Sequence, residues 1–151
     1  MKRVLIAIDY NPTSEKVVEE GYKLAKTLGA EVCLLHVIGN LQFYGIQYPR
    51  FMGHDSMNYA LNPDFQEEMK DVAKVFLDNA VKHLNDDTVT SHISEGDTAK
   101  EILQYAKDWQ ASLIVMGTHS HSKLEKILMG TVASSVLERT ETPVYMVPVK
   151  P

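Results

Sequence analysis

The sequence predicts an α/β protein whose five parallel strands form a single doubly wound sheet, with helices on both faces. Short apolar runs recur along the chain, segments with apolar residues at three- and four-residue steps separate them, and turn residues bound most of the runs. Such continuous apolar runs are typical of strands buried on both faces. Because the runs alternate with four helical segments, the strands are expected to be parallel.

The first half of the chain holds two strands and one helix. Residues 4–8 (VLIAI) form the first expected strand, and residues 31–38 (EVCLLHVI) form the second. Thr13 or Ser14 is expected to cap the intervening helix, which Gly29 stops. Residues 39–63 lack a clear periodicity, and we expect a long loop, which in compact domains is usually functional or mobile.

A long helix is expected next, from Asp64 to about Leu84. Its apolar face is predicted from Phe65, Met69, Val72, Val75, Phe76, Leu77 and Val81. Residues 88–93 are β-branched and predict a strand close to the edge of the sheet.

The last third continues the alternation. Asp97 is expected to cap a helix over residues 98–109, and residues 113–116 (LIVM) form the fourth strand. A helix from about Thr131 to Arg139 precedes a final strand at 144–149. Pro148 favours an edge position for that strand.

Length and composition exclude several classes of protein. A chain of 151 residues is expected to form one domain, 1–151. Its net charge of −5 argues against a nucleic-acid partner. Asp9 interrupts the first apolar run too early for a signal peptide, and no run approaches the roughly 18 apolar residues of a membrane span. The single Cys33 excludes an internal disulfide. We therefore expect a cytoplasmic protein without a membrane partner.

A candidate phosphate cradle lies between residues 112 and 131. An apolar strand leads into Gly117 and a small polar loop, and Gly130 and Thr131 precede a helical pattern. Gly130 either weakens that helix or starts it, since glycine costs about 1 kcal/mol inside a helix. If the helix starts here, its first amides are free, and Thr131 can cap it and offer a hydroxyl to an anion.

The fold class predicts where a ligand binds. In doubly wound sheets, ligands lie beyond the carboxyl ends of the strands, where the strand order reverses. The candidate walls are therefore the ends of the first, second and fourth strands, which carry Ala7, Asp9, Val37, Ile38, Met116 and Gly117.

These stretches together resemble the universal stress protein family over nearly the whole chain. The resemblance rests on VLIAIDYNPTSEK, LGAEVCLLHVI, EGDTAKEILQYAKDWQASLIVMGTHS and ETPVYMVPV. Nucleotide-binding members of the family carry G-x2-G-x9-G-[ST] after the fourth strand. The corresponding positions here are Gly117, Ser120, Gly130 and Thr131. Ser120 replaces the second glycine, and serine adopts a positive φ less easily, although its amide and hydroxyl can still donate hydrogen bonds.

The resemblance implies a homodimeric, adenine-nucleotide-binding regulatory module in the stress response. Its ligand would be ATP or AMP, with Mg²⁺ as an accompanying ion. Asp9 would accept hydrogen bonds from the ribose, and Ala7 with Val37 or Ile38 would border the adenine. The remaining contacts would come from Met116 and Gly117 at the ribose and first phosphate, and from Ser120, Gly130, Thr131 and Val132 at the phosphates. The dimer would form through the last strand, and an unidentified protein partner would respond to the ligand.

Two alternatives stay open beside this function. The first is a dimeric interaction protein of the same fold that has lost nucleotide binding through Ser120, and the second is a weak ATPase. Neither a Walker A motif nor G-x-G-x-x-G follows a strand, so no catalytic residue is assigned.

Several conspicuous residues have competing interpretations. His119 and His121 are expected to be surface residues rather than zinc ligands, because no Cys or carboxylate lies nearby in sequence. Cys33 is expected to be an inert core thiol, and His36 a hydrogen-bonded residue of the same strand. The aromatic residues within 43–58 predict either a lid over the pocket or a dimer contact, or else a segment folded onto its own core.

Overall fold

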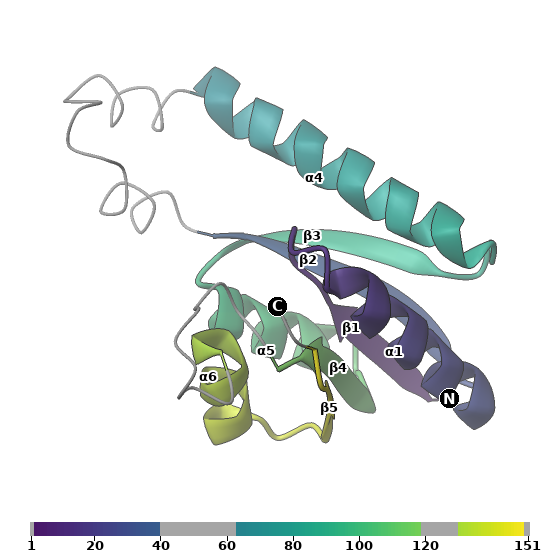
Figure 1. Ribbon diagram of the computed structural model, residues 1–151. Helices are drawn as coiled ribbons and strands as arrows, with labels where there is room; N and C mark the ends of the chain where they lie inside the picture. Colours follow the sequence, from purple (N-terminus) through teal and green to yellow (C-terminus); the bar gives the residue numbers. More distant parts are fainter. Residues whose placement is uncertain (1, 40–62, 119–129, 150–151) are drawn as a thin grey trace.

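The protein is described by a computed structural model that covers residues 2–39, 63–118 and 130–149. Within these residues, five strands form one parallel sheet in the order β3-β2-β1-β4-β5 (Figure 1). The strands are β1 (Arg3–Ala7), β2 (Glu31–Gly39), β3 (Thr90–Gly96), β4 (Leu113–Gly117) and β5 (Val144–Val147). The predicted five-stranded parallel sheet is confirmed, and the last strand lies at an edge.

Helices cover both faces of this sheet. They are α1 (Ser14–Leu28), α4 (Pro63–Leu84), α5 (Thr98–Asp108) and α6 (Thr131–Arg139). Figure 1 shows α1 and α4 on one face and α5 and α6 on the other. None of the helices in the described ranges is both long enough and apolar enough to cross a membrane.

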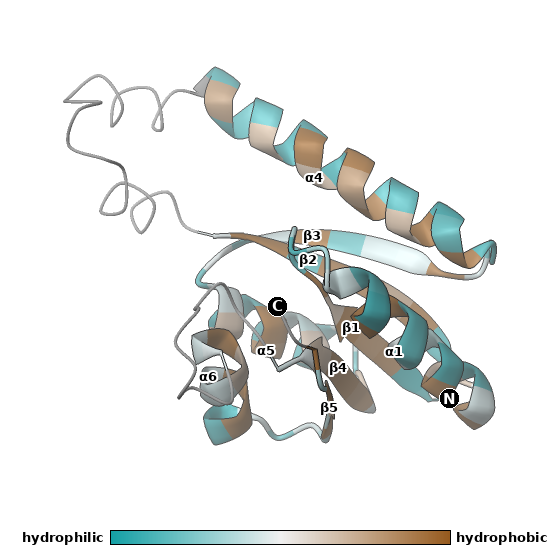
Figure 2. Cartoon of the chain, viewed as in Figure 1, coloured by the Kyte–Doolittle hydropathy of each residue, from teal (hydrophilic) through white to brown (hydrophobic). Residues whose placement is uncertain are grey.

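Alternate residues of the central strands build two separate cores. Ile6, Leu34 and Val115 belong to the core under α1 and α4, whereas Leu5 and Ile114 belong to the core under α5 and α6. The central strands therefore need apolar side chains at successive positions, and Figure 2 shows β1 and β4 as mostly hydrophobic.

The two edge strands differ from their predicted bounds. β3 runs from Thr90 to Gly96 rather than from residue 88 to residue 93. It starts later because the amide and hydroxyl of Thr88 both donate to Asp86 Oδ1 in a turn, at 2.9 and 2.6 Å. β5 ends at Val147 rather than at residue 149. Pro148 has no amide hydrogen to donate to a strand ladder, and the Val149 amide instead donates to Thr118 Oγ1 at 3.1 Å.

The predicted apolar face of α4 was wrong at two positions. Val72 and Val75 are both 59% exposed, whereas Ala73 and Leu77 are buried. Phe76, Ala80, Val81 and Leu84 are partly buried against the same core as Leu77, and together with Ala73 these residues form one stripe along the helix. Val72 and Val75 fall outside that stripe.

The helix ends agree in part with the prediction. Gly29 ends α1 with a φ of 64°, which favours glycine, and the Asp97 side chain caps α5 by accepting from the Lys100 amide at 3.0 Å. Thr13 occupies the N-cap position of α1, but its side chain makes no capping hydrogen bond. Ser14 points back toward Asp9 instead.

Candidate functional site

A pocket of about 260 Å³ lies at the predicted edge of the sheet. β2 and β4 flank β1 on opposite sides, so the strand order reverses between β1 and β4. Ile6 pairs with Val115 there, and the pocket opens just beyond this pair. The pocket therefore lies at the topological switch point, where a ligand site was expected.

Most of the predicted site residues line this pocket. They are Ala7, Asp9, Val37, Met116, Gly117, Gly130 and Val132. Ile38 and Thr131 are not among the lining residues. Ile38 follows Val37 in β2 and therefore points to the opposite face of the sheet, and Thr131 is exposed. Ser120 lies outside the described residues, as do His119, His121 and the aromatic residues of 43–58.

The pocket also has walls that were not predicted. These are Ile8, Tyr10, Thr13, Ser14, Val17, Leu35, His36, Thr98, Ile102, Ala133 and Val149. Ser14 and Thr98 are the first residues of α1 and α5. Helices that follow parallel strands begin at the carboxyl edge of the sheet, so the sequence did contain a signal for these two. Tyr10 and Val149 had no such signal.

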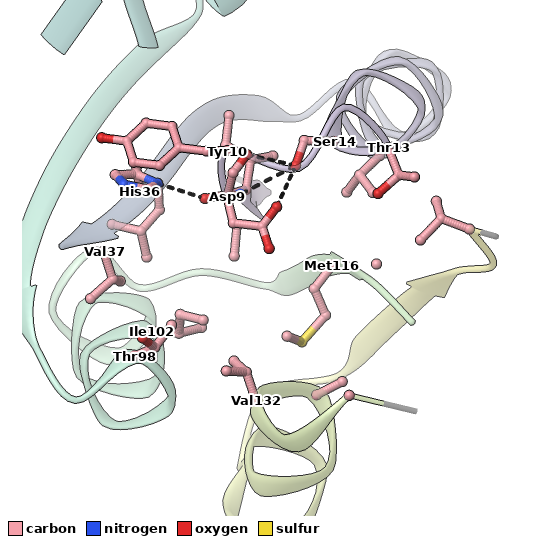
Figure 3. Close-up of a pocket in the computed structure, with 18 residues that line it drawn as sticks. Asp9, Tyr10, Thr13, Ser14, His36, Val37, Thr98, Ile102, Met116 and Val132 are labelled. Atoms are coloured by element: carbon pink, nitrogen blue, oxygen red, sulfur yellow. Dashed lines mark hydrogen bonds between the residues drawn. The ribbon is translucent and has the colours of Figure 1, made fainter. Parts of the chain in front are cut away.

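Asp9 is held in a fixed orientation by the loop that follows β1. Its Oδ1 atom accepts from the Asn11 amide and from the Ser14 hydroxyl, each at 3.0 Å. The Ser14 hydroxyl also lies 2.8 Å from the Asp9 carbonyl and accepts from the Asp9 amide at 3.2 Å. Figure 3 shows the second carboxylate oxygen directed into the pocket. One oxygen thus anchors the loop, and the other is available to a ligand.

An apolar surface lies opposite this carboxylate. Val37, Ile102, Met116 and Val132 come from four different elements and surround the lower part of the pocket in Figure 3. Ile102 and Met116 are 2% and 5% exposed, so they form a fixed wall. A flat apolar ring could be buried against this wall.

His36 closes the pocket beside Asp9. Its Nδ1 atom donates to the Ile8 carbonyl at 3.0 Å, and its ring packs against Tyr10 and Phe76 with centroids 4.5 and 5.4 Å away. Burial lowers the pKa of His36, although the hydrogen bond to Ile8 and the charge of Asp9 act in the other direction. The structure therefore favours a neutral imidazole. The prediction that His36 is a hydrogen-bonded residue of this strand is confirmed.

The N-terminus of α6 brings backbone amides that have no intrahelical partner among the described residues to the other end of the pocket. The Gly130 amide donates to the Thr118 carbonyl at 2.8 Å, and the first intrahelical bond runs from the Ser134 amide to the Gly130 carbonyl at 3.0 Å. The amides of Thr131, Val132 and Ala133 precede that bond and can bind an anion. Gly130 is the N-cap and does start the helix, whereas Thr131 is its first residue and not its cap.

Gly117 has a packing role as well as its place in the pocket. A Cβ atom at this position would lie 3.0 Å from Val17 Cγ2 and 3.3 Å from Val149 Cγ2. The end of β4 therefore packs tightly against α1, and a Cβ atom at this position would require Val17 to move by a few tenths of an ångström. The glycine allows the last part of the chain to pack beside the pocket.

Cys33 lies apart from this pocket. Its thiol is buried near the Tyr105 hydroxyl, at 3.9 Å, and burial raises the pKa of the thiol. A buried thiol with a raised pKa is a poor nucleophile, in agreement with the inert role expected for it.

Comparison with known proteins assigns the family. The model of the universal stress protein family matches residues 1–148. Universal stress protein MJ0531 of Methanocaldococcus jannaschii is 31% identical, over 97% of this chain and 81% of the relative. Universal stress protein MJ0577 of the same organism is also 31% identical, over 97% and 94% of the two chains.

Solved structures give the same result. The structure of MJ0577 superposes with a TM-score of 0.78 at 29% identity and covers 99% of this chain and 97% of its own. Two further structures share the fold at a TM-score of 0.61. One is a universal stress protein in complex with cAMP, 17% identical over 97% of this chain and 95% of its own. The other, from Archaeoglobus fulgidus, is in complex with dAMP and is 18% identical over 97% of each chain. The chain belongs to the universal stress protein family.

Proposed function

We propose that the pocket at the carboxyl edge of the sheet binds an adenine nucleotide, ATP or AMP, and that the protein works as a regulatory module in the stress response. One observation carries this proposal: Asp9, an apolar wall and the amides that start α6 meet in a single pocket at the strand-order reversal. The complexes of two family structures with cAMP and dAMP support the ligand class.

The adenine would lie against the apolar wall. The side chains of Val37, Met116 and Val132 line this space, as does Ala7. A volume of about 260 Å³ is close to the lower limit of roughly 300–1,000 Å³ for small-molecule sites. It suits a nucleoside with its phosphates extending outward, not a larger cofactor.

The ribose would lie between the adenine and the phosphates, because it joins them covalently. The free oxygen of Asp9 can accept charge-assisted hydrogen bonds from ribose hydroxyls. The amides of Thr131, Val132 and Ala133 would receive the phosphates, since a helix N-terminus favours negative charge. Mg²⁺ would accompany ATP in its usual role of neutralising the phosphate tail.

A calorimetric titration tests the site directly. We expect AMP and Mg·ATP to bind wild-type protein, and Asp9→Asn to weaken binding about tenfold or more. Val132→Glu should abolish binding, because it places a carboxylate in the apolar wall that would hold the adenine. Leu137→Glu makes the same kind of change on an exposed part of α6 and serves as the matched control. Equal affinity in wild type and Val132→Glu would contradict the proposed site.

The variant Ser120→Gly separates this function from its main alternative. Restoring the glycine should strengthen binding, because glycine lets the backbone approach a phosphate more closely. If wild type binds no nucleotide and Ser120→Gly does, the protein is an interaction module whose pocket has lost its ligand. Release of inorganic phosphate from Mg·ATP would identify a weak ATPase.

The edge strand β5 supports a homodimer as a second part of the proposal. The carbonyls of Pro143 and Val147 accept from β4, so the alternate residues Val144 and Met146 direct their backbone groups away from it. Unpaired edges of this kind pair readily with another strand. Tyr145, 42% exposed, would add side-chain contact.

A substitution on the outer edge of β5 tests the dimer. Met146→Pro removes an amide that faces away from β4, and we expect it to convert the dimer to a monomer in sedimentation velocity. Leu137→Glu, on α6, should leave the dimer intact. A wild-type monomer, or a Met146→Pro dimer, would contradict pairing through β5.

A further inference from the structure

A second cluster of ligand-type side chains lies away from the nucleotide pocket, between α1 and α4. Glu15 and Glu19 are four residues apart on α1 and therefore share one face of that helix. His83, near the end of α4, approaches both: its Nε2 atom lies 3.0 Å from Glu19 Oε1 and 3.7 Å from Glu15 Oε1. One ligand atom from each of the three residues lies within 4.8 Å of the others.

These separations are close to those of a metal centre. Zinc binds nitrogen and oxygen at about 2.0–2.2 Å, which places neighbouring ligand atoms roughly 3.0–3.6 Å apart for tetrahedral or octahedral angles. The two distances from His83 already lie near that range. Small rotations of the two glutamates would complete the triangle.

The chemistry of the three donors selects the ion. Two carboxylates and one neutral imidazole carry a charge of −2, which attracts a divalent cation. Without a metal, the protonated imidazole supplies the positive charge, since the hydrogen bond to Glu19 and the charges of the two glutamates raise the pKa of His83; a bound ion would take the place of that proton. Imidazole favours zinc and neighbouring transition metals over magnesium and calcium. Two carboxylates and one histidine also leave a coordination position for water, as three-ligand zinc sites do.

Access to the cluster is open. The side chains of Glu15, Glu19 and His83 are 67%, 47% and 47% exposed, respectively. An ion could therefore enter without unfolding, and water could complete its coordination. Because the ligands come from two helices, a bound ion would join α4 to α1, whose first residue Ser14 lines the nucleotide pocket.

We propose that Glu15, Glu19 and His83 form a binding site for one Zn²⁺ ion that joins α1 to α4. The site does not depend on the proposed nucleotide function, because none of its three ligands lines the pocket. Ion pairing between His83 and the two glutamates, without a metal, is the competing interpretation. The two differ in whether zinc binds there.

The test is a titration of ZnCl₂ into nucleotide-free protein in a non-chelating buffer, combined with thermal unfolding. We expect one ion to bind per chain and to raise the melting temperature, because zinc binds the folded state. His83→Ala and Glu19→Gln should each weaken binding at least about tenfold. Glu19→Gln keeps a hydrogen-bonding side chain and so separates the loss of a metal ligand from the loss of a helix contact.

Two controls assign the ion to this cluster. Glu20→Gln changes the neighbouring glutamate, which pairs with Lys23, and should leave zinc binding unchanged. The double variant His119→Asn/His121→Asn lacks two histidines that lie close together in the sequence. It should still bind one zinc ion per chain. Absence of zinc binding, binding that survives both His83→Ala and Glu19→Gln, or binding lost in His119→Asn/His121→Asn would each overturn the proposal.

Discussion

The hydroxyl of Ser14 lies 3.0 Å from the carboxylate of Asp9 and links the first residue of α1 to the end of β1. The same hydroxyl contacts the backbone of Asp9 at 2.8 and 3.2 Å. Ser14 is buried, so these contacts cannot be replaced by bulk water without rearrangement. This residue therefore orients the carboxylate that we assign to ribose binding.

Replacing Ser14 with alanine should affect both stability and affinity. Removing one partner from a buried hydrogen-bonded group costs about 1–3 kcal/mol, and we expect a loss of that size in urea unfolding. AMP affinity should fall as well, because the Asp9 carboxylate loses one of the two groups that hold its Oδ1 atom.

The control for this prediction is Thr27→Ala. Thr27 lies on the same helix, and its hydroxyl bonds only to the Lys23 carbonyl among the described residues, at an exposed position. It should change AMP affinity little. If Ser14→Ala lowers stability but binds AMP as wild type does, Ser14 has a purely structural role.

The sequence predicted the parts of the molecule that depend on local pattern. β1 and β4 were found because burial on both faces demands continuous apolar residues, as in VLIAI and LIVM. Asp9 and Met116 were assigned to one site because parallel strands end at the same edge of the sheet. Contacts between distant residues were missed. Phe76 packs on His36, and Val149 packs beside Gly117, and no periodicity encodes either pair.

Gly117→Ala should destabilise the protein through the contact with α1. The new methyl would lie 3.0 Å from Val17 Cγ2, and overpacking of this kind typically costs about 1–3 kcal/mol. Val17→Ala should relieve part of that cost. The double variant is therefore expected to lose about 0.5–3 kcal/mol less unfolding free energy than the two single variants lose in sum. Urea unfolding of all four proteins measures the coupling, and strict additivity would show that the end of β4 shifts freely.

Asp86 should contribute to stability in a pH-dependent way. Lys26, Thr88 and Tyr22 donate to its carboxylate at 2.6 Å each, and these contacts hold the pKa of Asp86 well below its ordinary range, with Lys26 the largest cause. Because the folded pKa is depressed, the stabilisation is present above the unfolded pKa of about 3.9 and is lost as the pH falls below it.

The measurement for Asp86 is the free energy of unfolding between pH 6 and pH 3. Asp86→Asn should lower stability at pH 6 and show a weaker loss on acidification than wild type. Asp87→Asn changes the adjacent exposed aspartate and is the matched control. A wild-type acid profile in Asp86→Asn would show that the contacts of Asp86 contribute nothing to folding.

His36 should destabilise the fold as it becomes protonated. Burial lowers its pKa, so the unfolded chain binds a proton first as the pH falls. The contribution of His36 to stability is therefore complete above its unfolded pKa of about 6.5 and declines as the pH drops below it.

We expect His36→Phe, which keeps a ring beside Tyr10 and Phe76, to lose this part of the pH dependence. Other groups contribute equally to both proteins, so the difference in unfolding free energy between variant and wild type from pH 8 to pH 5 isolates His36. A difference that stays constant over that range would mean that the imidazole takes up its proton as readily in the folded protein as in the unfolded chain.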